Sequence, residues 1–254
     1  MRFYDILPEI TKNVIARSPQ ATKPSLVEDR VLKLMDISSL ICVPIALLLG
    51  SIPCAYIVAK LRGKTDIRDE PDGKISAAAV YRRVGLLSFI IVVAMDIGKA
   101  ALAVLIAQWL KAAPPWVMLA GALAVAGHQW SMFLRFQGGR GATVIAGVLV
   151  AVCTIPTLIG AAIAGVLAWK TKNSTYSFAV GMIMITAVLF AMQWSEVTPP
   201  PVLIASPLPP PPLTAYHLLI AYPLILGLMM ALKALQVKYR PGATILIRPD
   251  EVSN

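Results

Sequence analysis

The 254-residue chain is 57% hydrophobic and only 14% charged, and it carries a formal net charge of +10. Soluble domains usually contain about 25% charged residues, so a mean hydropathy of +0.73 indicates a polytopic membrane protein and excludes an ordinary soluble enzyme. The acidic residues are scattered, and the three cysteines lie in apolar stretches without CxxC spacing. We therefore expect no metal and no cofactor, with the lipid bilayer as partner and no nucleic acid.

Residues 1–36 form a charged tail whose apolar residues recur at helical spacing, which predicts an interfacial amphipathic helix. One membrane domain is expected over 37–240, followed by a C-terminal cytoplasmic tail at 241–254. Six apolar blocks are near or above the ~20 residues that cross a bilayer: 37–59, 85–110, 116–134, 142–169, 177–194 and 215–235. The proline-rich loop 195–214 is expected to be an extended spacer.

Basic residues concentrate after the first, third and fourth blocks and in the C-terminal tail, and these segments are expected to face the cytoplasm. The fourth block has basic residues at both ends, and as one helix it would be ~42 Å long. Pro156 lies near its middle, where a helix breaks. We predict two short helices, at about 142–153 and 157–169, forming a hairpin sheathed by protein. The expected fold is all-α, with about seven transmembrane segments, the N-terminus outside and the C-terminus inside.

The stretch FLRFQGGRGAT separates the third and fourth blocks. Gly138, Gly139 and Gly141 can adopt φ > 0 and leave no Cβ in the way of a ligand, so that N–H groups can point at one anion. Arg140 adds a forked permanent charge suited to phosphate, and Thr143 at the next helix N-terminus adds a donor. The pattern predicts an anion site; a flexible basic turn that anchors to anionic lipid is the alternative.

Asp96, Lys99 and His128 are ionisable residues within apolar segments. Asp96 and Lys99, in MDIGKA, share a helix face as an i, i+3 pair. Intramembrane ionisable groups are costly enough to be functional candidates, although a helix-stabilising salt bridge is an open alternative. His128, in AVAGHQW, precedes the glycine loop and is either a base or a packed, hydrogen-bonded side chain.

Three stretches together resemble the bacterial acyl-phosphate:glycerol-3-phosphate acyltransferases, the PlsY family: GSIPCAYIVAKLRGKTDIR (50–68), MDIGKA (95–100) and GHQWSMFLRFQGGRG (127–141). The resemblance implies a seven-helix fold in the bacterial plasma membrane with its site at the cytoplasmic face. It implies that the sn-1 hydroxyl of glycerol-3-phosphate attacks the carbonyl of an acyl phosphate. The products would be lysophosphatidic acid and phosphate, a step of phospholipid biosynthesis.

The resemblance also implies roles for particular residues. The catalytic candidates are cations in or beside the matching motifs: Arg82, Lys99 and Arg140. The expected phosphate-binding residues are loop glycines and nearby donors: Gly138, Gly139, Gly141, Arg68 and Thr143. The expected supporting residues come from the same motifs: Ser51, Asp96 and His128.

The chain departs from the family pattern in two places. EPDGKISAAAVYR (70–82) stands where the family has HGSGNIGATNVLR, and LKALQVKYRPGA (232–243) lacks the family's HRxN-type cluster. Losing such polar groups removes hydrogen bonds of the kind that stabilise transition states. Two functions therefore remain open: an active acyltransferase with a drifted first motif, or a catalytically silent relative that binds lipid head groups or a partner. A transporter or channel is disfavoured, because no chain of ionisable groups crosses the bilayer.

Overall fold

The structure is a computed structural model that describes residues 37–69, 75–194 and 213–238, and every regular element in them is a helix. The predicted N-terminal amphipathic helix, the C-terminal tail and nearly all of the proline-rich spacer lie outside these residues. The helices are, in chain order, α3 (Ile37–Ser51), α4 (Cys54–Gly63), α5 (Ala77–Val84), α6 (Leu86–Trp109), α7 (Pro114–Gln129), α8 (Ala142–Val152), α9 (Thr154–Thr171), α10 (Ser174–Trp194) and α11 (Leu213–Lys238). Two short 3-10 turns are added, η2 (Ile67–Asp69) and η3 (Met132–Leu134).

The described helices are those of a multi-pass membrane protein. Six helical stretches are long and apolar enough to cross a bilayer, and the apolar helix α8 is shorter. The all-α membrane fold predicted from composition is therefore confirmed. With 11 residues, α8 extends about 16 Å, which is roughly half of the hydrocarbon thickness. The exact number of seven spans stays a prediction, because it counts α8 as a span.

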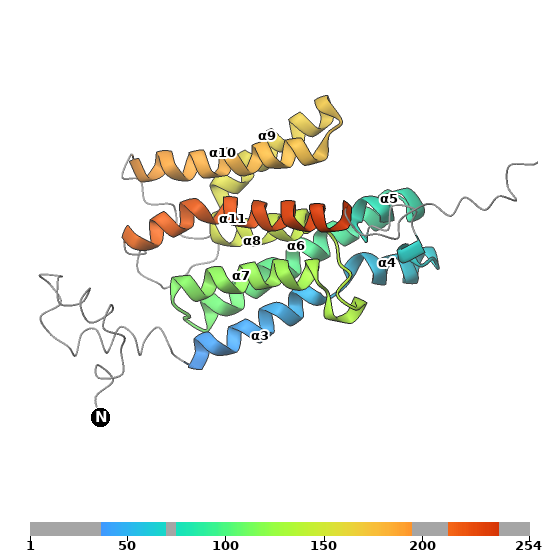
Figure 1. Ribbon diagram of the computed structural model, residues 1–254, viewed down its shortest axis with the longest axis horizontal. Helices are drawn as coiled ribbons and strands as arrows, with labels where there is room; N and C mark the ends of the chain where they lie inside the picture. The colour runs from blue at the N-terminus through green and yellow to red at the C-terminus, as the bar shows by residue number, and fades with distance from the viewer. Residues whose placement is uncertain (1–36, 70–74, 195–212, 239–254) are drawn as a thin grey trace, which may run out of the picture.

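The fourth apolar block is divided into two helices, as its length and flanking charges predict. The break is at Cys153, whose backbone is not helical at φ −145° and ψ 74°, and Pro156 lies in the first turn of α9, where no backbone partner is lost. The chain reverses direction at this break (Figure 1). The expectation that protein sheaths the whole hairpin is wrong for α9, because only 17% of its span is buried. A regular 18-residue helix satisfies its own backbone and tolerates lipid.

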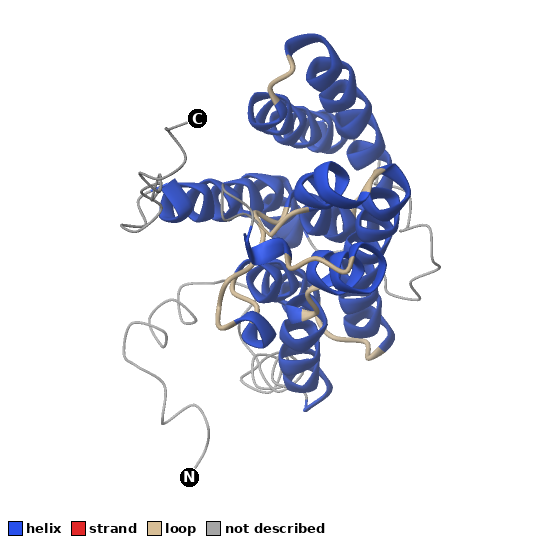
Figure 2. Cartoon of the chain, turned by 90° about the vertical axis from the view of Figure 1, so that its right-hand side faces the viewer, coloured by secondary structure: helices blue, strands red, loops and turns tan. Residues whose placement is uncertain are grey.

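The connections that carry the predicted site gather at one end of the bundle. The α4 and α5 helices and the loop between α7 and α8 lie at the right-hand end of Figure 1, and the loops of this end face the viewer in Figure 2. Helices α7 and α11 run parallel, because Tyr222 bonds to Met118 and Gln236 bonds to Trp130. The C-terminal end of α11 therefore reaches the same end of the molecule.

Two apolar cores meet on α6. The larger core lies between α3, α6, α7, α8, α10 and α11, and the smaller lies beneath α4, η2 and α5. Val92 of α6 belongs to the smaller core and Ala100 to the larger. Asp96 and Lys99 lie between them on the same helix, so the polar pair is held at the junction of the two cores.

Candidate functional site

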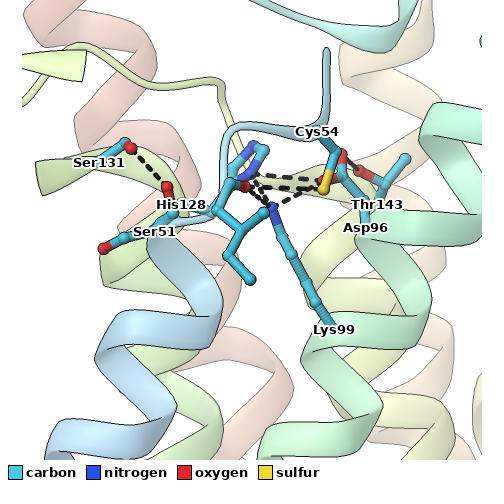
Figure 3. Close-up of polar contacts among 8 residues, drawn as sticks. Ser51, Cys54, Asp96, Lys99, His128, Ser131 and Thr143 are labelled. Atoms are coloured by element: carbon cyan, nitrogen blue, oxygen red, sulfur yellow. Dashed lines mark hydrogen bonds and ion pairs between the residues drawn. The ribbon is translucent and has the colours of Figure 1, made fainter. Parts of the chain in front are cut away.

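The first part of the site is a break in the first span. Helix α3 ends at Ser51 and α4 begins three residues later, because Pro53 has no N–H to continue the helical ladder. The break leaves the carbonyl of Ile52 to accept a hydrogen bond from Lys99 Nζ at 2.7 Å (Figure 3). Ser131 Oγ donates to the carbonyl of Ser51 at 2.5 Å, which fastens the break to the loop after α7.

Asp96 and Lys99 form a buried ion pair on α6. Their side chains are 3% and 5% exposed, and Lys99 Nζ lies 2.8 Å from Asp96 Oδ1. The other carboxylate oxygen accepts a hydrogen bond from Thr143 Oγ1 at 2.9 Å, so Asp96 also ties α6 to the first turn of α8. The pair is therefore more than a bridge within one helix, since its two members reach the α3–α4 break and α8.

His128, in the last turn of α7, completes the cluster. Its Nδ1 lies 3.1 Å from Lys99 Nζ and 3.8 Å from Asp96 Oδ1. Because an ammonium group can only donate, Nδ1 accepts and the ring proton is assigned to Nε2. Nε2 faces the glycine loop: a Cβ placed on Gly139 would lie 2.6 Å from it. His128 thus presents an N–H donor towards this loop, and its Nδ1 is already occupied.

The glycine loop packs so closely on its surroundings that side chains have no room. A Cβ on Gly138 would lie 1.9 Å from the backbone oxygen of His128, and one on Gly139 would lie 2.7 Å from the carbonyl oxygen of Ile75. The positive φ expected of the three loop glycines occurs only at Gly141, where φ is 91°. At Gly138 and Gly139 the missing Cβ instead lets neighbouring protein backbone lie close to the loop. The prediction of positive φ is therefore correct only for Gly141.

A buried glutamine holds the loop to α7. Gln129 is fully buried, and its Nε2 donates to the backbone carbonyl of Arg140 at 3.0 Å. Its Oε1 has no hydrogen-bond partner among the described residues. The Arg140 side chain is half-buried at this position. Gln129 therefore sets the backbone from which that guanidinium extends.

The other two predicted arginines lie near the surface. Arg82 is exposed in the last turn of α5. Arg68 pairs with Asp66, Nε to Oδ1 at 2.9 Å, and its guanidinium lies 5.2 Å from the Tyr56 ring centre. Hydrogen bonds from Arg68 lower the pKa of the Asp66 carboxyl to about 2. The predicted roles of both arginines in binding phosphate stay predictions.

The structure brings together Lys99, Asp96, His128, Thr143 and the glycine loop, and it places Ser51 behind them. It also adds four residues that the sequence patterns do not single out: Cys54, Gln129, Ser131 and Lys233. Cys54 Sγ lies 3.6 Å from the carbonyl oxygen of Ile52, beside the ion pair (Figure 3). Lys233 is 5% exposed, although its charge alone indicates only a cytoplasmic end of α11. Like Lys99, it interrupts an apolar helix, and that signal would have found it.

Fold and site together define a class of protein: a helical, multi-pass membrane protein with a buried lysine–aspartate–histidine cluster beneath a glycine-rich basic loop at one end. Comparison with known families makes the assignment specific. A family model described as glycerol-3-phosphate acyltransferase matches residues 40–241. The chain belongs to this family, as the resemblance of its motifs predicts.

Individual relatives agree with the family assignment. The chain is 40% identical over 116 residues to glycerol-3-phosphate acyltransferase 2 of Moorella thermoacetica, covering 46% of this chain and 59% of the relative. It is 34% identical over 158 residues to glycerol-3-phosphate acyltransferase 4 of Dehalococcoides mccartyi, covering 62% of this chain and 81% of the relative. In the first two relatives matched, the chain spans 59% and 52% of their length.

Solved structures show the same fold. Crystal structures of PlsY (YgiH), an integral membrane glycerol 3-phosphate acyltransferase, superpose with TM-scores of 0.63 for its glycerol 3-phosphate form and 0.61 for its lysophosphatidic acid form. The sequence identities are 24% and 23%, and each match covers 78% of this chain and 89% of the other. At this level of sequence identity, the structural similarity shows that the chain shares the helical fold of these structures.

Proposed function

We propose that the protein transfers a fatty acyl group from an acyl phosphate to the sn-1 hydroxyl of glycerol-3-phosphate. The hydroxyl oxygen forms a bond to the acyl carbonyl carbon, the bond from that carbon to the phosphate oxygen breaks, and phosphate leaves with the electron pair. The hydroxyl proton is released, and lysophosphatidic acid and phosphate are the products. Family membership supports the reaction class.

The observation that carries the proposal is the buried cluster of Lys99, Asp96 and His128, which lies directly against the glycine loop. Both substrates carry phosphate, and the loop offers Arg140 as a fixed charge suited to it. The His128 Nε2–H faces the same loop and is a further donor to an anion there. Lys99 holds the ring in that tautomer and balances the charge of Asp96, so that the surplus positive charge beside the loop is that of Arg140.

The cluster favours positioning and charge neutralisation over general base catalysis. Lys99 occupies Nδ1 of His128, Thr143 donates to Oδ2 of Asp96, and Oδ1 of Asp96 is held in the ion pair with Lys99 although it accepts no hydrogen bond among the described residues. An acyl phosphate already carries a good leaving group, so orienting the hydroxyl and stabilising the developing oxyanion supply much of the rate. Arg82 lies in α5, which is at the same end of the bundle (Figure 1), and Arg68 lies in η2, which follows α4; both are proposed as additional phosphate partners.

We further propose that this end of the bundle faces the cytoplasm, with the N-terminus outside and the C-terminus inside. Lys60, Arg62 and Lys64 at the end of α4 and the arginines of α5 support this orientation. The loop between α6 and α7, at the other end, contains only Lys111 as a basic residue.

A phosphate-release assay tests the proposed reaction. Purified protein is given acyl phosphate with and without glycerol-3-phosphate, and inorganic phosphate is measured. We expect release that needs both substrates, its loss in Arg140→Ala and substantial retention in Arg140→Lys. Lys111→Ala, at the opposite end, is the matched control and should retain full activity. Binding of both substrates without release would instead identify a silent relative.

A further inference from the structure

The Lys99 ammonium has partners on three separate elements. It lies 2.8 Å from Asp96 Oδ1 on its own helix, 2.7 Å from the Ile52 carbonyl at the α3–α4 break, and 3.1 Å from His128 Nδ1 at the end of α7. One ammonium group reaches all three only if the break and the end of α7 keep a fixed separation. A shift of about 1 Å would lengthen at least one of the two hydrogen bonds beyond normal range. Whatever sets that separation therefore also sets the orientation of the His128 ring.

Ser131 joins the break to the end of α7 directly. Its side chain is buried, and its Oγ donates at 2.5 Å to the carbonyl of Ser51, the residue before Ile52 (Figure 3). Because α3 ends at Ser51, this carbonyl has no partner in the helical ladder, and within the described residues the Ser131 hydroxyl is its donor. Gly127 lets the two helices lie close enough for this bond, since a Cβ there would be 2.9 Å from the Ser51 backbone nitrogen. The hydroxyl thus fixes the carbonyl next to the one that Lys99 uses.

The backbone of Ser131 also shapes the loop that leads to the glycines. Its carbonyl accepts from the backbone N–H of Leu134 at 3.1 Å and from that of Phe136 at 2.8 Å. The second bond closes a turn in which both Arg135 and Phe136 have positive φ, at 52° and 62°. Two consecutive non-glycine residues in this region are uncommon and persist where surrounding contacts impose them. Ser131 therefore fixes the path of the chain between His128 and the glycine loop as well as the break.

We propose that Ser131 is a positioning residue for the acyl transfer. Its hydroxyl sets the Ile52 carbonyl at the distance from His128 that Lys99 can bridge, and Lys99 then holds the imidazole with its Nε2–H towards the glycine loop. Without the hydroxyl, the buried Ser51 carbonyl loses its donor, and the break shifts to satisfy that carbonyl elsewhere. Lys99 then loses its contact with the ring, and the tautomer is no longer defined. This inference rests on the proposed function and deepens it.

Nitrogen NMR of the histidine ring tests this positioning without requiring turnover. The chain has 2 histidines, so His217→Gln in protein with isotopically labelled histidine leaves the signals of His128 alone. With Ser131 in place, we expect a protonated Nε2 and an unprotonated Nδ1. Ser131→Ala should move the Nδ1 signal towards the average of the two tautomers, and Ser131→Thr, which keeps the hydroxyl, should restore it. Thr157→Val is the matched control and should leave the signal in place, because the Thr157 hydroxyl also donates to a backbone carbonyl, at 2.7 Å, but within α9.

Steady-state kinetics of phosphate release provide the second readout. Ser131→Ala should lower kcat about ten- to hundredfold, because a misplacement of about 1 Å has an effect of this size. The KM for glycerol-3-phosphate should change by less than about threefold, because the residues that bind it are intact. A merely structural role predicts a lower Tm with unchanged kcat and unchanged histidine signals, and that result overturns the proposal. A moved Nδ1 signal with unchanged kcat also contradicts it.

Ser131→Cys keeps the proposal falsifiable if Ser131→Ala does not fold. Its thiol occupies nearly the same space and is a weaker donor, so the Nδ1 signal should move in the same direction by a smaller amount. An Nδ1 signal that does not move in either variant overturns the proposal whatever the activity. If the unaltered protein releases no phosphate but the Ser131 variants still move the Nδ1 signal, the result counts against the acyl transfer reaction alone.

Discussion

Replacing Lys99 by methionine separates the structural from the chemical role of the buried cluster. The ammonium contacts Asp96 at 2.8 Å, the Ile52 carbonyl at 2.7 Å and His128 Nδ1 at 3.1 Å. Its removal leaves the Asp96 carboxylate buried, with the Thr143 hydroxyl as its remaining donor in the cluster. Breaking one partner of a buried pair costs about 3–5 kcal/mol. For a domain of this size the Tm should fall by about 6–20 °C.

The double variant Asp96→Asn with Lys99→Met separates the effect on stability from the effect on activity. It removes both charges and keeps an acceptor for Thr143, so stability should return to near that of the unaltered protein. Phosphate release should remain about 10²–10³-fold low in both variants, because the electrostatic support near the reacting phosphate is gone. Thermal unfolding in detergent and phosphate release are measured on the same preparations. A double variant that is stable and fully active would show that the cluster is only structural and would contradict its assigned role in phosphate release.

Three further outcomes are expected. Gly138→Ala should lower both Tm and phosphate release, because its Cβ would lie 1.9 Å from the His128 carbonyl oxygen; Gly165→Ala, with nothing within 4 Å of its Cβ, should do neither. His128→Asn, which keeps an acceptor near Nδ1 but lacks the Nε2–H, should retain the Tm and lose about tenfold or more in phosphate release; an active variant would contradict the assigned tautomer. Arg68 lowers the pKa of Asp66 to about 2. The ionised carboxylate therefore stabilises the folded state at any pH above the pKa of Asp66 in the unfolded chain, and this stabilisation is lost as the pH falls from that value towards 2. Asp66→Asn and the unaltered protein should therefore show parallel Tm values between pH 5 and 8, and divergence there would contradict the assignment.

The sequence predicts those parts of the fold and site that depend on local chemistry. Apolar length and the placement of basic residues predict the membrane helices and the division of the fourth block. Asp96, Lys99 and His128 stand out because ionisable groups are costly in an apolar segment. That these three residues lie close together is also consistent with the family resemblance, because they belong to two of its motifs. Family membership itself is confirmed by the match over residues 40–241.

Other features depend on long-range packing that one sequence does not specify. The partner of Lys99 at Ile52 is a backbone carbonyl 47 positions away, exposed by a proline break. Gly138 and Gly139 are needed because protein backbone, rather than a ligand, approaches them. Lys233 contacts Trp130 at the end of α7 because α11 runs beside α7. Residues 70–74, part of the segment 70–82 in which the chain departs from the family pattern, lie outside the described residues.

The most direct test of the central claim is the formation of lysophosphatidic acid by purified protein in lipid vesicles. Acyl phosphate and glycerol-3-phosphate are supplied together, and the lipid product and inorganic phosphate are quantified in the same reaction. We predict equimolar product and phosphate, both dependent on glycerol-3-phosphate and both lost in Lys99→Met. Phosphate binding without lipid product, or product that persists in Lys99→Met, would contradict the assignment of this cluster as the centre of acyl transfer.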